Sequence, residues 1–458
     1  MDQVDTLFVG GQIFTPDGLV KATLGVANGK VAFISCTEWT PPAKETIDIS
    51  RKILSPGFID THVHFRDPGL TYKEDFLTGT QGAAAGGVTC VADMPNTKPA
   101  LTTEERFHAK LAEVRGKAVV DYALYAGATK MSEIPGMLRA GAIGVKVFLV
   151  CDPKSRYPHD PELFSGDDGV LYDTIKLAKE LGSYVAVHPT NQQIFEHESR
   201  KRWETGKTKP RDFMEAYFGE NHVSDHTAIA KLIEMARASG TRTHILHLRS
   251  EPGIRIIQTA KEQGVPVSME VNPKYMFTTF ADLEKKGPLC VPYATSPESK
   301  QMLIDCANKG WIDVYGTDHA PHTREEMEPG WNDAWSIPFG NPQVEHYMTA
   351  LLSLVSSGKM ALKTLVRMCS EQPARLMGVW PRKGCIQVDS DADFAVLDMN
   401  ARGAIPDKVY TKVGWSPYSG MQYHGLPVMT VVRGKVVMRD GKVIGQPGYG
   451  QLIRADAA

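Results

Sequence analysis

Residues 53–65 read ILSPGFIDTHVHF, an apolar run that ends on two histidines spaced two apart. Short apolar runs of this kind are typical of buried strands, because the strands of a parallel sheet are covered on both faces. Seven similar runs follow: VTCVADMP (88–95), VVDYALYAG (119–127), AIGVKVFLV (142–150), SYVAVHP (183–189), RTHILHL (242–248), PVSMEV (266–271) and IDVYGTD (312–318). The sequence therefore predicts eight buried strands.

Helix-like patterns lie between several of these strands. Examples are YDTIKLAKELG (172–182), HTAIAKLIEMARASG (226–240) and SKQMLIDCANKG (299–310). Strands that alternate with helices predict a parallel sheet, and eight of them favour a closed (β/α)₈ TIM-like barrel in the α/β class. The alternative is an open, doubly wound sheet. We find no glycine-rich phosphate fingerprint after the first strand to support it.

The residue pattern at both ends of the chain differs from that of the middle. TLFVGGQIFTPDG (6–18) consists of short apolar runs separated by turn residues, and VRGKVVMRDGKV (432–443) is typical of a hairpin with its turn at Asp440-Gly441. We therefore predict a small β-sandwich domain assembled from residues 1–52 and 378–458, and a barrel domain over residues 53–377.

The composition narrows the possible partners and locations. The 458 residues carry a formal net charge of −2, and no basic block suggests a nucleic-acid partner. No apolar run approaches the roughly 18 residues of a membrane-spanning helix, and the N-terminus lacks the pattern of a signal peptide. The seven cysteines are scattered and form no CxxC pair, which disfavours a cysteine-rich zinc site. We expect a cytoplasmic protein.

Potential metal ligands lie at the ends of the predicted strands, where barrel active sites are built. His62 and His64 point to the same side of their strand, so both imidazoles can bind one ion. Lys146 lies inside an apolar run, where burial should lower its pKa and leave a neutral amine. Such an amine can add carbon dioxide to give a carbamate, whose two oxygens can bridge two ions. The alternative is a lysine whose amine reaches solvent.

Three more strand ends carry suitable side chains. His188 and His247 each end a strand and would serve a second ion, and Asp318 ends the last one. Asp318 is expected to bind metal and also to act as the general base and acid. Read alone, it would be a helix N-cap. We assign His244 and His319 to local structure.

Together, four histidines, one modified lysine and one aspartate give nitrogen and oxygen donors without thiolates, which suits Zn²⁺. Two divalent ions about 3.5–4 Å apart would generate a hydroxide and polarise a carbonyl. Asp318 would pass the proton to the leaving nitrogen. We place His322 over the substrate.

The order and spacing of these motifs resemble one known family. PGFIDTHVHFRDPG (56–69), DMPNTKP (93–99), the Lys146 strand, VHP (187–189), HILHL (244–248), GTDHAPH (316–322) and PARLMG (373–378) are similar to the cyclic amidohydrolase branch of the amidohydrolase superfamily. Its members include dihydroorotases, allantoinases and hydantoinases. The resemblance covers nearly the whole chain. It implies one ion on His62, His64 and Asp318, a second on His188 and His247, and a carboxylated Lys146 between them.

The resemblance to dihydroorotases extends to the residues that hold a substrate carboxylate. Arg66, Asn96 and His322 match that group, and an arginine can bind a carboxylate through two parallel hydrogen bonds. The alternative for Arg66 is a salt bridge to Asp67 or Glu74.

Several positions depart from the dihydroorotase pattern. Val291 replaces an asparagine that contacts the ring, Pro273-Lys274-Tyr275 replaces a Pro-His-His or Pro-His-Tyr stretch, and Leu248-Arg249-Ser250 replaces Val-Ser. Residues 151–168 have no counterpart that we can place. The resemblance therefore implies dihydroorotase-like hydrolysis of a cyclic amide, with an allantoinase or hydantoinase as the alternative. A non-catalytic scaffold, a third possibility, would usually have lost metal ligands. The resemblance also implies a homodimer or homotetramer.

Overall fold

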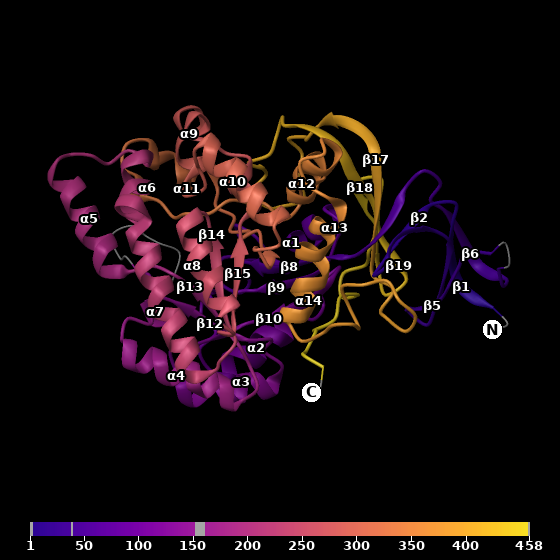
Figure 1. Cartoon of the computed structure of the whole chain (residues 1–458), viewed down its shortest axis with the longest axis horizontal. Helices are drawn as coiled ribbons and strands as arrows, with labels where there is room; N and C mark the ends of the chain where they lie inside the picture. Colours follow the sequence, from indigo (N-terminus) through magenta and orange to yellow (C-terminus); the bar gives the residue numbers. More distant parts are fainter. Residues whose placement is uncertain (1–2, 38–39, 152–160, 457–458) are drawn as a thin grey trace.

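A computed structural model describes residues 3–37, 40–151 and 161–456 of the chain (Figure 1). The middle of the chain forms the expected (β/α)₈ barrel, and all of the barrel strands pair in parallel. The segments are β8 (Phe58–Val63), β9 (Val88–Asp93), β10 (Asp121–Leu124), β11 (Ala126–Gly127), β12 (Val145–Phe148), β13 (Val185–His188), β14 (Thr243–Leu248), β15 (Val267–Val271) and β16 (Val314–Tyr315).

The barrel closes between its first and last strands. β10 and β11 are two parts of one barrel strand, so these segments make eight strands. Val63 forms a parallel bridge with His319, and the His64 N–H donates to the His319 carbonyl at 2.7 Å. The end of β8 and the segment after β16 are therefore neighbours.

Helices surround the barrel and extend over the carboxyl ends of its strands. The surrounding helices are α1 (Phe76–Ala85), α2 (Glu104–Val114), α3 (Ile134–Ala140), α4 (Asp168–Glu180), α7 (Val223–Ser239), α8 (Glu251–Glu262), α10 (Pro297–Asn308), α12 (Tyr347–Ser356), α13 (Leu362–Val366) and α14 (Gln372–Leu376). Further helices lie in the strand-to-helix connections: α5 (Gln192–Glu204), α6 (Pro210–Phe218), α9 (Phe280–Lys286) and α11 (Arg324–Met327). No helix of the described residues is long and apolar enough to cross a membrane.

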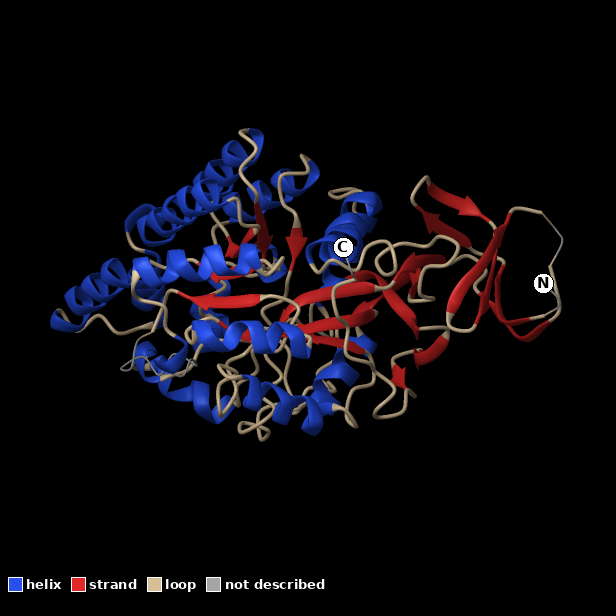
Figure 2. Ribbon diagram, turned by 90° about the horizontal axis from the view of Figure 1, so that it is seen from below, coloured by secondary structure: helices blue, strands red, loops and turns tan. Residues whose placement is uncertain are grey.

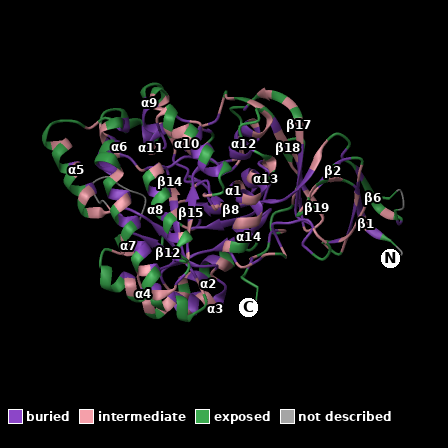
Figure 3. Cartoon of the chain, in the orientation of Figure 1, coloured by how far each residue is buried: buried purple, intermediate pink, exposed green. Residues whose placement is uncertain are grey.

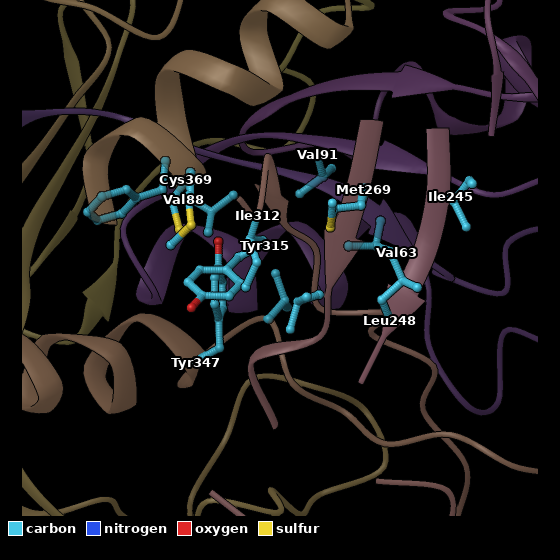
Figure 4. Close-up of a cluster of buried hydrophobic side chains, with 14 of the residues drawn as sticks. Val63, Val88, Val91, Ile245, Leu248, Met269, Ile312, Tyr315, Tyr347 and Cys369 are labelled. Atoms are coloured by element: carbon cyan, nitrogen blue, oxygen red, sulfur yellow. The ribbon is translucent and has the colours of Figure 1, made fainter. Parts of the chain in front are cut away.

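The barrel strands and the helices around them differ in how far they are buried. The barrel strands are buried along their length, whereas outer helices such as α4 and α7 expose their outward faces (Figure 3). Figure 4 shows part of the apolar layer outside the strands, where Tyr315 lies near Tyr347 and Val63 lies near Met269. Residues that alternate with these along the strands point into the barrel, and His62 and His64 are two of them.

The two ends of the chain form two further sheets beside the barrel (Figure 2). One is β5-β4-β1-β6, made of β1 (Val4–Val9), β4 (Thr23–Ala27), β5 (Lys30–Ser35) and β6 (Ala43–Asp48). The other is β20-β19-β18-β17-β7-β2-β3, with β2 (Gln12–Thr15), β3 (Gly18–Lys21), β7 (Ile53–Pro56), β17 (Phe394–Ala404), β18 (Gln422–Val432), β19 (Lys435–Arg439) and β20 (Lys442–Val443). The hairpin at Asp440-Gly441 is confirmed.

The interpretation of residues 53–65 as a single strand was wrong. β7 pairs with β17 and β2 in the terminal sheet, and only β8 belongs to the barrel. The two separate at Gly57, where a Cβ atom would lie 2.2 Å from the Thr89 hydroxyl oxygen. Only glycine lets the backbone approach so closely there. The exact domain boundaries stay a prediction.

A buried charge cluster joins the barrel to the terminal sheet. The Lys383 ammonium lies 2.7 Å from Asp121 at the start of β10 and 2.6 Å from Asp393 just before β17. Replacing Lys383 by methionine should leave the Asp393 carboxylate buried without its cation, while Asp121 keeps its ion pair with Arg433, and lower the free energy of unfolding by about 3–5 kcal/mol. Urea denaturation measures this change. Lys44→Met, which removes an exposed ion pair to Asp5, is the control and should change it far less. An equal change in the free energy of unfolding in both variants would contradict a stabilising role of the buried charge cluster.

Candidate active site

The carboxyl ends of the barrel strands bring the predicted ligands together. They come from β8, β12, β13, β14 and the segment after β16: His62, His64, Lys146, His188, His247 and Asp318. The His62 and His64 rings lie 5.2 Å apart, and the His62 and His247 rings 5.9 Å apart. His62, His64 and Asp318 place one ligand atom each within 4.8 Å of one another, a group that can hold a metal ion.

His62 and His64 turn unprotonated nitrogens toward Asp318. Nδ1 of His62 lies 2.8 Å from Glu270 Oε1, and Nδ1 of His64 lies 2.5 Å from Asn96 Oδ1. Because both partners are oxygen acceptors, each Nδ1 carries the proton and each Nε2 presents a lone pair. These Nε2 atoms lie 3.3 and 2.9 Å from the same Asp318 oxygen. Lone pairs that face one another in this way fit a cation between them.

The electrostatics of these groups agree with that geometry. Burial lowers the pKa of His62 to about 3 and the pKa of His64 to about 4, so both rings are neutral at pH 7. Burial raises the pKa of Asp318, but the positive charge that His62 and His64 gain in acid outweighs burial and holds this pKa well below its usual range. Neutral imidazoles beside a carboxylate are the protonation states that a divalent ion binds.

Lys146 is buried with its amine unpaired. The residue is 1% exposed, its Nζ has no hydrogen-bond partner among the described residues, and it lies 4.5 Å from the centre of the Phe148 ring. Burial lowers the pKa of Lys146 to about 7, although the charges of Asp318 and Glu270 oppose the shift. A large fraction of the side chain is therefore a neutral amine near pH 7, the form that reacts with carbon dioxide.

His188 and His247, the two ligands predicted for a second ion, lie side by side. Nδ1 of His188 lies 3.0 Å from Nε2 of His247, with the ring centres 4.3 Å apart. The other nitrogen of His188, Nε2, contacts the Tyr217 hydroxyl. The two facing nitrogens fit a second ion.

Three residues of the site adopt left-handed backbone conformations. φ is 62° at Arg66, 42° at His247 and 50° at Asp318. Such angles are uncommon outside glycine and recur at functional sites, because the surrounding structure must hold them. Here they direct three polar side chains toward the barrel mouth.

Sequence reasoning missed the residues that hold the predicted ligands in place. Glu270 on β15 orients His62, and Tyr217 on α6 contacts His188. The Tyr293 hydroxyl donates to Asp318 Oδ2 at 3.0 Å. Glu270 had a detectable signal, since a glutamate inside an apolar strand rarely lacks a partner. The two tyrosines come from a helix and a loop, where the strand pattern gives no guidance.

We predict that Glu270→Gln weakens metal binding about 10–100-fold, because a carboxylate that holds a metal-binding histidine also makes it a better ligand. Burial raises the pKa of Glu270 to about 8 and the charge of Asp318 adds to this effect, so the carboxylate itself needs a nearby cation to stay ionised. Competition with a zinc chelator measures the affinity. Glu262→Gln, at an exposed position on α8, is the control. Equal zinc affinity in both variants would contradict the prediction.

The predicted substrate residues lie beside the ligands, with partners that the sequence did not reveal. Arg66 forms no salt bridge with Asp67 or Glu74: Asp67 binds Lys117 at 2.8 Å, and Glu74 accepts from the Thr411 hydroxyl. The Arg66 Nη2 atom instead lies 3.1 Å from Nε2 of His322. Its Nε and Nη1 atoms are buried and have no partner in the described part of the chain.

The other predictions for this region have mixed outcomes. Asn96 contacts His64, one of the predicted metal ligands. The structural role of His319 is confirmed, since its Nδ1 accepts from the N–H groups of Gln343 and Val344. His244 contacts the Ser268 hydroxyl, as expected of a structural histidine. Of the segment 151–168, residues 152–160 lie outside the described residues.

Comparisons with known proteins identify the family of the chain. The family model described as "Amidohydrolase family" matches residues 53–437. A dihydroorotase of Methanothermobacter thermautotrophicus is 35% identical over 95% of each chain, and an allantoinase of Deinococcus radiodurans is 30% identical over 98% of this chain and 99% of its own. A solved L-hydantoinase (dihydropyrimidinase) from Arthrobacter aurescens superposes with a TM-score of 0.94 at 31% identity, covering 98% of this chain and 100% of that one. The chain therefore belongs to the amidohydrolase family, and within it to the branch of hydrolases that act on cyclic amides.

Proposed function

We propose that the chain is a dihydroorotase-like enzyme, which opens a cyclic amide bearing a ring carboxylate and interconverts dihydroorotate and N-carbamoyl-aspartate. The observation that carries this proposal is the Arg66 guanidinium, which is 1% exposed and keeps two nitrogens without a partner among the described residues. A planar fork of N–H donors that lacks an acceptor fits a carboxylate. Arg66 is two residues from the ligand His64, close enough to hold a substrate at the reacting centre.

We further propose that two divalent ions, preferably Zn²⁺, bind at the ends of the strands. His62, His64 and Asp318 would hold one ion, and His188 and His247 the other. Lys146 would bridge them as a carbamate: its neutral nitrogen bonds to the carbon of carbon dioxide, and a proton leaves. When bound, the ions lower the pKa of water and polarise the scissile carbonyl. Nitrogen and oxygen donors without a thiolate support zinc.

Asp318 would carry the proton in this reaction. Its Oδ1 faces the two histidines, so Oδ2 remains for proton transfer, and the Tyr293 hydroxyl donates to Oδ2. Asp318 takes a proton from the attacking water and returns it to the leaving ring nitrogen. We propose that Arg66, with Asn96 and His322, orients the substrate carboxylate.

Hydantoinase or allantoinase activity is the second candidate, and Val291 favours it. This side chain is 0% exposed in an apolar cluster, at the position where the resemblance to dihydroorotases implies an asparagine on the ring. Losing such a contact relaxes specificity for the ring. A non-catalytic scaffold is disfavoured, because all six ligands are retained. The homo-oligomeric state and the cytoplasmic location stay predictions.

A substrate panel distinguishes the two candidates. The zinc-loaded enzyme, prepared with bicarbonate, is assayed with dihydroorotate, allantoin and hydantoin under the same conditions. We expect kcat/KM for dihydroorotate to exceed the other two values by at least about 100-fold. A higher kcat/KM for allantoin or hydantoin would instead establish the second candidate.

A further inference from the structure

His322 lies between two cationic side chains that both approach its ring nitrogens. The Arg66 Nη2 atom is 3.1 Å from Nε2, and the Lys73 ammonium is 3.0 Å from Nδ1. The Phe339 carbonyl oxygen lies 3.2 Å from Nε2. His322 is 0% exposed and Lys73 is 6% exposed, so water does not replace these partners. With a cation on each side, the ring is neutral and carries a single proton.

The position of that proton decides which contacts are hydrogen bonds. With the proton on Nε2, the ring donates to the Phe339 carbonyl and its Nδ1 accepts from Lys73. With the proton on Nδ1, the ring accepts from Arg66 alone, and both Lys73 and the carbonyl lose their bond. The first tautomer makes two hydrogen bonds and the second makes one, so the Nε2–H form is favoured.

In the favoured tautomer, Arg66 and His322 face each other with N–H groups, and neither accepts from the other. Arg66 then has no acceptor at any nitrogen among the described residues. A substrate carboxylate beside the guanidinium would accept from these Arg66 N–H groups. Buried arginine donors without an acceptor select for an anionic ligand, because an uncharged apolar group would leave them unpaired.

We infer that Lys73 is a positioning residue: it holds the His322 proton on Nε2 and thereby keeps the Nη2 atom of Arg66 available for the substrate carboxylate. This inference rests on the proposed function, and it assigns a role to a side chain that does not touch the substrate. Lys73 is itself fixed by Glu326 on α11, at 2.7 Å, and the Tyr72 hydroxyl donates to the same Glu326 oxygen.

Removing Lys73 should reverse the preference of His322 for the Nε2–H tautomer. In Lys73→Met each tautomer makes one hydrogen bond, and the bond from Arg66 is the stronger because its donor is charged. Glu326, freed from Lys73 and 3.8 Å from Nδ1 of His322, would also attract the Nδ1 proton. His322 then accepts from Arg66 Nη2, and this nitrogen is no longer available to the substrate.

Nitrogen NMR of the zinc-loaded protein tests this step without substrate. With ¹⁵N-labelled histidine, and the His322 signal assigned by its loss in His322→Gln, we expect the Nε2–H tautomer in the wild type and a shift toward Nδ1–H in Lys73→Met. The wild-type measurement does not depend on how well the variant folds. An Nδ1–H tautomer in the wild type, or an unchanged Nε2–H tautomer in a folded Lys73→Met, would overturn the inference.

Enzyme kinetics then test the consequence of this tautomer for binding of the substrate carboxylate. For Lys73→Met we expect KM for dihydroorotate to rise about tenfold, the effect of one charged hydrogen bond, with little change in kcat or in KM for hydantoin. Lys98→Met removes an exposed charge from the same region and should change neither. An equal rise of KM for charged and uncharged rings would mean a merely structural role and overturn the inference. A wild-type enzyme active only on uncharged rings would refute the proposed substrate, while the NMR result would still decide the role of Lys73.

Discussion

Lys146→Met is expected to lower kcat on the order of 10⁴-fold and to remove most of the bound metal. Methionine has a similar length and suits the apolar surroundings of β12, so the barrel should fold. It cannot form a carbamate, however. His188 and His247 would then supply only two nitrogens to their ion, which is too few for stable binding. Elemental analysis and turnover, measured on the same preparation, check both effects.

The control for this variant is Lys274→Met. Lys274 is 2% exposed, and burial lowers its pKa to about 8, but it lies outside the group of six ligands. We expect this variant to keep its metal. In the wild type, preparation with ¹³C-labelled bicarbonate should give a carbamate signal that Lys146→Met lacks. Full activity and full metal content in Lys146→Met would refute the bridging role.

The convergence of the proposed ligands at the strand ends was predictable because two simple rules act together there. Alternate residues of a strand share a face, which pairs His62 with His64, and parallel strands of a barrel end at one mouth, which brings His188 and His247 to them. Lys146 was predictable for a related reason, since a lysine within a fully apolar run must find an unusual environment.

The residues that were missed depend on tertiary contacts. Tyr217 lies on α6 and Tyr293 in a loop, and neither position follows a strand or helix period that points to the site. The Arg66–His322 contact joins residues 256 positions apart, so neighbouring sequence suggested Asp67 or Glu74 as partners instead. The division of residues 53–65 at Gly57 was hidden as well, because only the packing against Thr89 reveals it.

Arg66→Met is expected to change which substrates are turned over. Two hydrogen bonds from the guanidinium to a carboxylate are worth about 1.5–3 kcal/mol each, so kcat/KM for dihydroorotate should fall about 10²–10⁴-fold. Hydantoin has no carboxylate, so kcat/KM for this ring should fall little. Measuring kcat/KM for both rings, together with the zinc content, separates a loss of recognition from a loss of metal.

Arg66→Lys is the informative partner of this variant, because it keeps the charge and removes the planar fork. A lysine makes a point contact with a carboxylate. We therefore expect kcat/KM of Arg66→Lys for dihydroorotate to lie between the values of the wild type and of Arg66→Met. If both variants lost activity equally on charged and uncharged rings, Arg66 would be holding the backbone of its left-handed turn, where φ is 62°, and not the substrate. A loss confined to the carboxylated ring is the result that only substrate recognition explains.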